Sequence, residues 1–131
     1  YGTNQKIPFD DNMFDALVSW DVLHYEGNDA NYHLALKEYQ RVLKPGGRLF
    51  LSTVAPKSSV LRNAKILEPH CYQLTREDDF RVGEIFFCCD EEAILKSYLS
   101  SYFIEILVGR ATDELFAETY DSFIATTLKG T

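Results

Sequence analysis

Hydrophobic and polar positions divide the first half of the chain into segments of two kinds. Residues 13–20 form a nearly continuous apolar run in which Asp15 is the charged exception. Parallel strands that are covered on both faces have this composition, so the run predicts a buried strand. Residues 48–53 predict a second buried strand for the same reason.

Between these two strands, apolar residues recur at three- and four-residue steps and predict an amphipathic helix. Its apolar stripe consists of Tyr32, Ala35, Leu36, Tyr39, Val42 and Leu43. Asn28 or Asp29 is expected to cap the helix, and the run Lys44-Pro45-Gly46-Gly47 is expected to end it. A strand, a helix and a second strand in this order predict a parallel pair with a right-handed connection.

The pattern is weaker between residues 55 and 89. Residues 59–67 predict a short helix, whereas residues 70–89 mix aromatic and charged positions without a clear period. A segment of this kind is expected to be an irregular excursion over a pocket.

The end of the chain predicts one helix and two strands. Asp90 is expected to cap the helix, whose apolar face consists of Ile94, Leu95, Tyr98, Leu99 and Tyr102. Strands are predicted at residues 103–108 and 122–128, with a polar, partly helical connection at residues 111–120. Because no full crossover helix separates these two strands, they are expected to be antiparallel neighbours.

Charge and composition narrow the classes of function. The 131 residues carry a formal net charge of -7, and they contain no run of Lys or Arg. Broad contact with phosphate backbones requires a clustered basic face, so nucleic acid is not expected as a partner. No apolar segment approaches the roughly 18 to 20 residues that cross a bilayer, so no membrane association is expected.

Three cysteines, Cys71, Cys88 and Cys89, bear on the compartment and on metal binding. Their odd number and the adjacent pair argue against a disulfide framework, which favours a reducing, cytoplasmic location. Together with His70 they lack the ligand spacing of a zinc site, so no metal is expected.

Two motifs stand out in the sequence: IPFDDNMFDALVSWDVLHY at residues 7–25 and RVLKPGGRLFL at residues 41–51. Together they resemble the second half of the class I S-adenosylmethionine-dependent methyltransferases, in the branch that acts mostly on small molecules. The resemblance implies an α/β fold, a Rossmann-like methyltransferase sheet with a parallel βαβ core and an antiparallel final strand. It implies a single, partial methyltransferase domain over residues 1–131, with the N-terminal strands missing from this chain.

The same resemblance implies transfer of a methyl group from the cofactor S-adenosylmethionine to a small-molecule acceptor. Two alternatives stay open. A methyltransferase-like domain without catalytic activity would serve binding or assembly, and another doubly wound enzyme, such as a nicotinamide oxidoreductase, would share the parallel core. The antiparallel final strand and the motif at residues 7–25 weigh against the oxidoreductase.

Open α/β sheets bind ligands at the carboxyl ends of their strands, and the resemblance assigns cofactor contacts to this region. It implies an adenine contact from Thr3 and Asn4, where Thr3 stands in the place of the usual Asp or Asn. It implies contacts of Ser19 and Trp20 with the methionine portion, and of Leu23 with the adenine or ribose side. The glycine-rich loop and the ribose-binding acidic residue of the family are expected upstream of Tyr1.

Candidates for the chemistry of the acceptor follow directly. His24 is the predicted catalytic base, because a histidine near its ordinary pKa could accept a proton from a hydroxyl or enol nucleophile. Further residues are predicted to line the acceptor pocket, namely Tyr25, His70, Tyr72 and Arg76.

Without the strands that precede it in the family, the predicted strand at residues 13–20 would be an open, hydrophobic sheet edge. We therefore expect a missing N-terminal segment or another chain to cover this edge. On its own, the chain is expected to bind the cofactor weakly or not at all and to be inactive.

Overall fold

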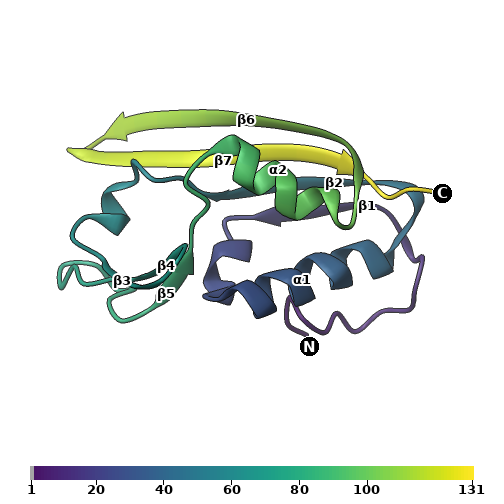
Figure 1. Cartoon of the computed structure of the whole chain (residues 1–131), viewed down its shortest axis with the longest axis horizontal. Coiled ribbons are helices and arrows are strands. Elements are labelled where there is room, and N and C mark those ends of the chain that lie inside the picture. Colours follow the sequence, from purple (N-terminus) through teal and green to yellow (C-terminus); the bar gives the residue numbers. More distant parts are fainter. Residues whose placement is uncertain (1) are drawn as a thin grey trace.

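The computed structural model describes residues 2–131, which are built around a four-stranded sheet with the order β1-β2-β7-β6 (Figure 1). The strands are β1 (Phe14–Trp20), β2 (Leu43–Val54), β7 (Glu118–Leu128) and β6 (Ile104–Leu115). β1 and β2 run parallel, with Val18 opposite Phe50, and the other neighbours run antiparallel. The predicted parallel core and antiparallel final strand are both confirmed, and the final strand lies between β2 and β6.

Helix α1 (Asp29–Val42) connects the two parallel strands. Asn28 caps it, because its side-chain oxygen accepts a 2.8 Å hydrogen bond from the backbone N–H of Asn31. The predicted apolar stripe is buried, and the chain passes directly from Val42 into β2. Among residues 2–131, no helix combines the length and the apolar character that crossing a membrane requires.

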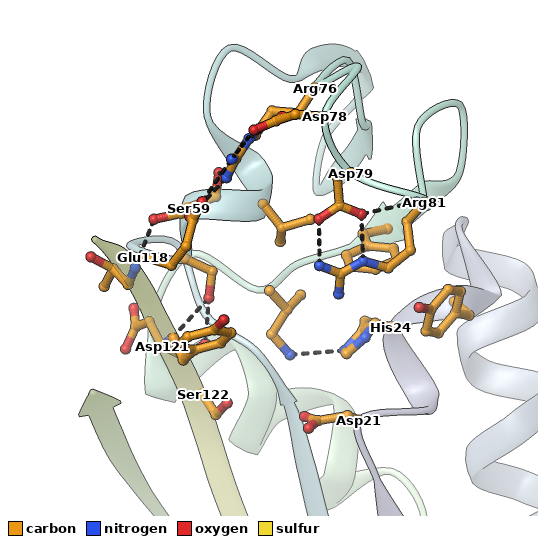
Figure 2. A pocket seen from close by; sticks show the side chains of 17 residues that line it. Asp21, His24, Ser59, Arg76, Asp78, Asp79, Arg81, Glu118, Asp121 and Ser122 are labelled. Carbon is orange, nitrogen blue, oxygen red and sulfur yellow. Dashed lines mark hydrogen bonds and ion pairs between the residues drawn. The ribbon is translucent and has the colours of Figure 1, made fainter. Parts of the chain in front are cut away.

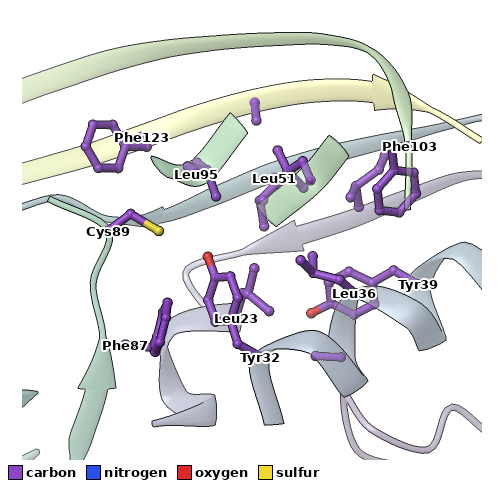
Figure 3. Packing of buried hydrophobic residues seen from close by; sticks show 14 of the residues in the cluster. Leu23, Tyr32, Leu36, Tyr39, Leu51, Phe87, Cys89, Leu95, Phe103 and Phe123 are labelled. Atoms are coloured by element: carbon purple, nitrogen blue, oxygen red, sulfur yellow. The ribbon is translucent and has the colours of Figure 1, made fainter. Parts of the chain in front are cut away.

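Helix α2 (Glu92–Ser100) packs on the same face of the sheet as α1, with Leu95 and Leu99 fully buried. Figure 3 shows this core, in which Leu51 of β2 and Phe123 of β7 lie over side chains from both helices. The prediction that Asp90 caps α2 is wrong. The capping position is Glu91, and the carboxylate of Asp90 instead accepts a hydrogen bond from the hydroxyl of Tyr72.

The opposite face of the sheet is apolar and exposed. Val18 of β1 is 65% exposed, and its partner Phe50 of β2 is 41% exposed. Trp20 and Leu107 continue this surface at 53% and 69% exposure. Both helices of residues 2–131 lie on the other side of the sheet, so these side chains remain open to solvent in this chain (Figure 1).

The segment between β2 and α2 forms a small lobe that the sequence did not predict. The expected helix at residues 59–67 is confined to the 3-10 turn η2 (Ser59–Leu61), and the following residues form strands. A three-stranded antiparallel sheet consists of β3 (Lys65–Glu68), β4 (Cys71–Gln73) and β5 (Ile85–Phe87). Strands of three or four residues are too short to show a period, so the pattern left them hidden.

The prediction of a partly helical connection at residues 111–120 is also wrong. β6 and β7 continue through this region as one long hairpin, and the turn residues Phe116 and Ala117 have φ angles of 52° and 64°. Gly, Asn and Asp are the usual residues of such turns. None of these three residues occurs at Phe116 or Ala117, so the sequence does not predict a hairpin turn here.

Candidate functional site

The carboxyl end of β1 turns sharply into the 3-10 helix η1 (Leu23–Glu26). Asp21 at this turn has a φ of 55°, in the left-handed region that few residues other than glycine adopt. Its backbone N–H donates to Oγ of Ser52 at 2.9 Å, and that hydroxyl donates to Oδ1 of Asp21 at 2.9 Å. Ser52 of β2 therefore holds the Asp21 carboxylate at the end of the sheet.

Gly27 ends η1 and lets it approach the small lobe closely. Its φ is 71°, and a Cβ at this position would lie 3.0 Å from the carbonyl oxygen of Ile85. A larger residue would therefore be strained and would push η1 away from β5. The glycine keeps η1 and the small lobe together as two walls of one site.

A cavity of about 340 Å³ lies between these walls (Figure 2). Its lining comes from the end of β1, η1, the end of β2, η2, the segment between β4 and β5, and the start of β7. The carboxyl ends of the parallel strands β1 and β2 thus open into the cavity, as expected for a ligand site in an open α/β sheet.

His24 forms the floor of the cavity and is 4% exposed. Its Nδ1 accepts a 3.0 Å hydrogen bond from the backbone N–H of Val54. Burial lowers the pKa of His24 to about 4, while Asp21 opposes this shift and Arg81 adds to it. The imidazole is therefore neutral at pH 7 and carries its proton on Nε2.

This hydrogen bond argues against the predicted role of His24 as a base. Nδ1 is occupied by a backbone donor, and Nε2 already carries a proton, so neither nitrogen can accept one from a substrate in this arrangement. The side chain can instead donate a hydrogen bond from Nε2, which has no partner among residues 2–131.

Arg76 joins the small lobe to the β6–β7 hairpin. Its guanidinium donates two hydrogen bonds to Glu118, at 2.7 and 2.8 Å, and two to Asp78, at 2.7 and 3.1 Å. These bonds raise the pKa of Arg76 and lower the pKa of both carboxyls. Arg76 lies in the cavity wall, and its donors are already engaged within the protein.

Two further carboxylates of the lining are paired in the same way. Arg81 donates to both oxygens of Asp79, at 2.9 and 2.8 Å, and these bonds lower the pKa of Asp79 to about 2. Burial would raise the pKa of Asp121, but hydrogen bonds from Arg110 and Thr112 outweigh it and lower this pKa to about 2. Both acids are therefore ionised at pH 7.

The lining is negatively charged as a whole. It contains five carboxylates and two guanidinium groups, so its net charge is -3 with His24 neutral. Arg110, which bonds to Asp121 from outside the lining, reduces this charge to -2. Such a cavity attracts cations and repels phosphates and carboxylates.

The structure brings together only part of the predicted acceptor site. His24, Tyr25 and Arg76 all line the cavity. His70 and Tyr72 lie outside this cavity beside Asp90, at 3.6 and 3.2 Å from its carboxylate oxygens.

The predicted cofactor contacts also divide into two groups. Leu23 is fully buried in the core, and Ser19 bonds to the buried hydroxyl of Tyr39 at 2.8 Å. Their side chains therefore pack toward α1. Asn4 accepts a 2.9 Å hydrogen bond from Tyr39, whereas Thr3 and Trp20 are exposed.

Several residues of the cavity were missed from the sequence. Asp79, Arg81, Glu118 and Asp121 come from the small lobe and the hairpin, neither of which the pattern resolved. Asp21 carried the one usable signal, a carboxylate directly after a buried strand. Among residues 2–131, no group of three or more His, Cys, Asp or Glu side chains is placed to hold a metal ion.

Comparison with known proteins places residues 2–51 in a match to the family described as a methyltransferase domain. The ubiquinone/menaquinone biosynthesis C-methyltransferase UbiE of Chromobacterium violaceum is 50% identical over 48 residues, which are 36% of this chain and 18% of that protein. The probable tRNA methyltransferase 9B of Homo sapiens is 42% identical over 48 residues, which are 37% of this chain and 11% of that protein. The chain thus spans less than a fifth of the length of these relatives.

A crystal structure of a SAM-dependent methyltransferase from Methanosarcina mazei shares the fold. Its TM-score is 0.77 at 19% sequence identity, and the match covers 98% of this chain and 65% of that chain. The likeness therefore extends over the small lobe and the hairpin, well beyond the residues that the sequence comparisons match.

Proposed function

We propose that this chain forms the acceptor side of a small-molecule methyltransferase. It has the fold of the class I S-adenosylmethionine-dependent methyltransferases, and it matches a methyltransferase-domain family over residues 2–51. The observation that carries the proposal is the cavity at the carboxyl ends of β1 and β2. Its volume of about 340 Å³ suits a small molecule. His24 and Tyr25 in its wall belong to the motif that the family match covers.

The residues of this chain fit one edge of a methyl-donor site. Trp20 exposes its indole at the end of β1, and the left-handed turn at Asp21 opens the strand end beside it. Asn4 lies at the amino-terminal approach, held by Tyr39. S-adenosylmethionine, when bound, supplies a methyl group on a positively charged sulfur. We assign the rest of that site to parts of the protein beyond residues 2–131.

The contribution of this chain to the reaction would be positioning. Methyl transfer is an in-line displacement, and holding the reacting groups in line supplies much of its acceleration. His24 offers a neutral N–H donor on the cavity floor, and Asp21 offers a carboxylate at the end of β1. Arg76 and Glu118 keep the cavity walls in place.

The charge of the cavity favours a small molecule over RNA as the acceptor. One relative is described as a probable tRNA methyltransferase, whereas another acts in quinone biosynthesis by its name. RNA brings phosphates, which a lining of net charge -3 and a chain of net charge -7 would repel. Because of this negative charge, we propose a small molecule and not RNA as the acceptor.

The exposed face of the sheet supports a larger assembly around this chain. Val18, Trp20 and Phe50 form an apolar surface that a soluble protein rarely leaves open. We propose that further residues of the same protein cover it, because the matched Methanosarcina structure extends beyond the part that this chain covers.

The test is calorimetric titration of S-adenosylmethionine and S-adenosylhomocysteine into the full-length protein, with the 131-residue chain alongside. We expect binding by the full-length protein and weak or no binding by the isolated chain. Transfer of a tritiated methyl group is then measured separately into a small-metabolite extract and into bulk transfer RNA. Label in the metabolite fraction supports the proposal, and label only in RNA would reverse the acceptor class. If neither protein binds the cofactor, the methyltransferase proposal is overturned, and a non-catalytic binding domain becomes the favoured hypothesis.

A further inference from the structure

We propose that the methyl acceptor is an amine, and that the carboxylate of Asp21 pairs with the positive charge that the amine nitrogen acquires during transfer. This inference rests on the proposed methyltransferase function. It is carried by three features of the cavity: an unpaired carboxylate, an N–H donor of His24 without a partner among the described residues, and the absence of a free base on His24.

Asp21 differs from the other acids of the cavity in having no cationic partner. Asp78 and Glu118 share Arg76, Asp79 pairs with Arg81, and Asp121 pairs with Arg110. For Asp21, the side-chain partner within residues 2–131 is the hydroxyl of Ser52, which donates to Oδ1 and leaves Oδ2 open. The strained turn at Asp21 is thus stabilised by Ser52 in a position where its carboxylate faces the cavity.

His24 supplies the second, independent feature. It is 4% exposed and lines the cavity, its Nδ1 is bonded to Val54, and its Nε2–H has no partner among the described residues. This N–H is accessible from the cavity, so a ligand in the cavity can place an acceptor atom against it. The site therefore suits a molecule that carries an amine and, close to it, a hydrogen-bond acceptor such as a hydroxyl, carbonyl or ring nitrogen.

The balance of the reaction agrees with an amine. An amine that enters as its ammonium first releases one proton to water, because the ammonium nitrogen has no lone pair. The freed lone pair then forms the new N–C bond while the S–C bond breaks and its electron pair stays on sulfur, so the positive charge passes from sulfur to nitrogen. The surplus proton of the resulting ammonium then leaves to water. An alcohol would have to give up its proton as the bond forms, and the His24 nitrogen that faces the cavity already carries one. The carboxylate of Asp21 is a weak base toward an alcohol, whereas it pairs directly with a positively charged nitrogen. Asp21 would stabilise the charge that develops on nitrogen.

The net charge of the lining disfavours anionic acceptors. With five carboxylates and two guanidinium groups, the cavity disfavours carboxylates and phosphates. Both arginines are also engaged by acids of the protein, so neither is free to bind an anionic substrate.

The experiment compares Asp21→Asn with Asp10→Asn in the full-length protein. Asn keeps the shape of the side chain, can accept the bond from Ser52 and tolerates the left-handed backbone, but it removes the charge. Asp10 lies in the turn before β1, away from the cavity, and its substitution changes the net charge by the same amount. The probes are benzylamine, benzyl alcohol and benzoate, which share one ring. Each is titrated by calorimetry, and methyl transfer to each is measured with tritiated S-adenosylmethionine.

We expect benzylamine to bind more tightly than the alcohol or the acid and to receive the methyl group. Asp21→Asn should weaken amine binding and lower kcat/KM for the amine about 10- to 100-fold, the range for a hydrogen bond to a charged group. Binding of S-adenosylhomocysteine, which has no sulfonium charge, should stay within about twofold, and Asp10→Asn should match the unsubstituted protein.

The two proposals can fail separately. If S-adenosylhomocysteine binds but the alcohol or the acid is preferred, or if Asp21→Asn leaves amine binding unchanged, the amine inference is overturned while methyl transfer stands. If amine binding depends on Asp21 but no S-adenosylhomocysteine binds, the cation site stands and the methyltransferase function falls. If neither ligand binds, both proposals are overturned.

Discussion

The backbone N–H of Val54 donates a 3.0 Å hydrogen bond to Nδ1 of His24 and so fixes the tautomer of a histidine on the floor of the cavity. Thr53 lies beside it, with its hydroxyl 3.3 Å from the same nitrogen. The ring of Phe86 covers one side of the imidazole, with the two centroids 4.4 Å apart. These neighbours bury most of the imidazole, and burial disfavours the imidazolium, so the neutral form is favoured.

We predict that His24 remains in the neutral Nε2–H form down to about pH 5, because burial lowers its pKa to about 4. Long-range proton–nitrogen NMR correlations across a pH titration measure this directly. His33, which is partly exposed on α1, provides an internal comparison in the same spectra. A His24 that gains its second proton near pH 6.5 would contradict the fixed tautomer.

The same shift makes stability depend on pH. The pKa of His24 is lower in the folded protein than its ordinary value of 6.5. The contribution of neutral His24 to the free energy of unfolding is therefore complete above pH 6.5 and is lost as the pH falls through about 4. The loss is on the order of 2 to 3 kcal/mol. We expect His24→Gln to remove this dependence between urea unfolding at pH 7 and pH 4.5. His33→Gln is the matched control and should retain it.

Long periodic segments were the part of the fold that could be predicted. α1 and β2 bury an apolar stripe and an apolar face, to which Leu36 and Leu51 belong, and such long patterns identify the element. β1 was predicted from its continuous apolar run, although Val18 of that run is exposed in this chain. The antiparallel end of the sheet followed from the short connection between its last strands. The short elements could not be predicted, because three-residue strands such as β4 and the hairpin turn at Phe116 show no periodic pattern of apolar residues.

The candidate site could be predicted only where it follows β1. His24 and Tyr25 were found because they come directly after a buried strand. Arg81 and Glu118 enter the cavity from the small lobe and the hairpin, so their positions depend on packing that no local pattern encodes. For Leu23, proximity in sequence to the crevice did not indicate which way its side chain points.

A second prediction concerns the hydrogen-bond chain beneath β1. Tyr39 donates its hydroxyl proton to Asn4, so Ser19 must be the donor in its own 2.8 Å bond to Tyr39. Tyr39→Phe leaves the buried Ser19 hydroxyl without a partner and is expected to cost about 1 to 3 kcal/mol in urea unfolding. Adding Ser19→Ala should recover part of this loss, because an apolar pair needs no partner. A double substitution as costly as the sum of the two single ones would contradict the chain.

A third prediction concerns the ion pair between Arg76 and Glu118, which joins the small lobe to the hairpin. Glu118→Gln removes one carboxylate from Arg76 and should let the segment at residues 76–83 move away from the cavity. We expect several-fold faster amide hydrogen exchange in that segment, together with a higher KM for the acceptor and a nearly unchanged kcat. Glu114→Gln, an exposed acid on the same hairpin, is the matched control. Equal exchange rates in the two variants would show that the pair does not hold the wall.

The last prediction tests what covers the open face of the sheet. Val18 on this face and Ile66 on β3 are both 65% exposed in this chain, so lysine at either site should change the stability of the 131-residue chain by no more than about 0.5 kcal/mol. In the full-length protein a covered Val18 would become a buried lysine, which costs several kcal/mol when it has no partner. We therefore expect Val18→Lys to lower the Tm of the full-length protein by several degrees, while Ile66→Lys leaves it nearly unchanged. Equal Tm values for the two variants would mean that the face stays open, and the sheet edge would then need another chain to cover it.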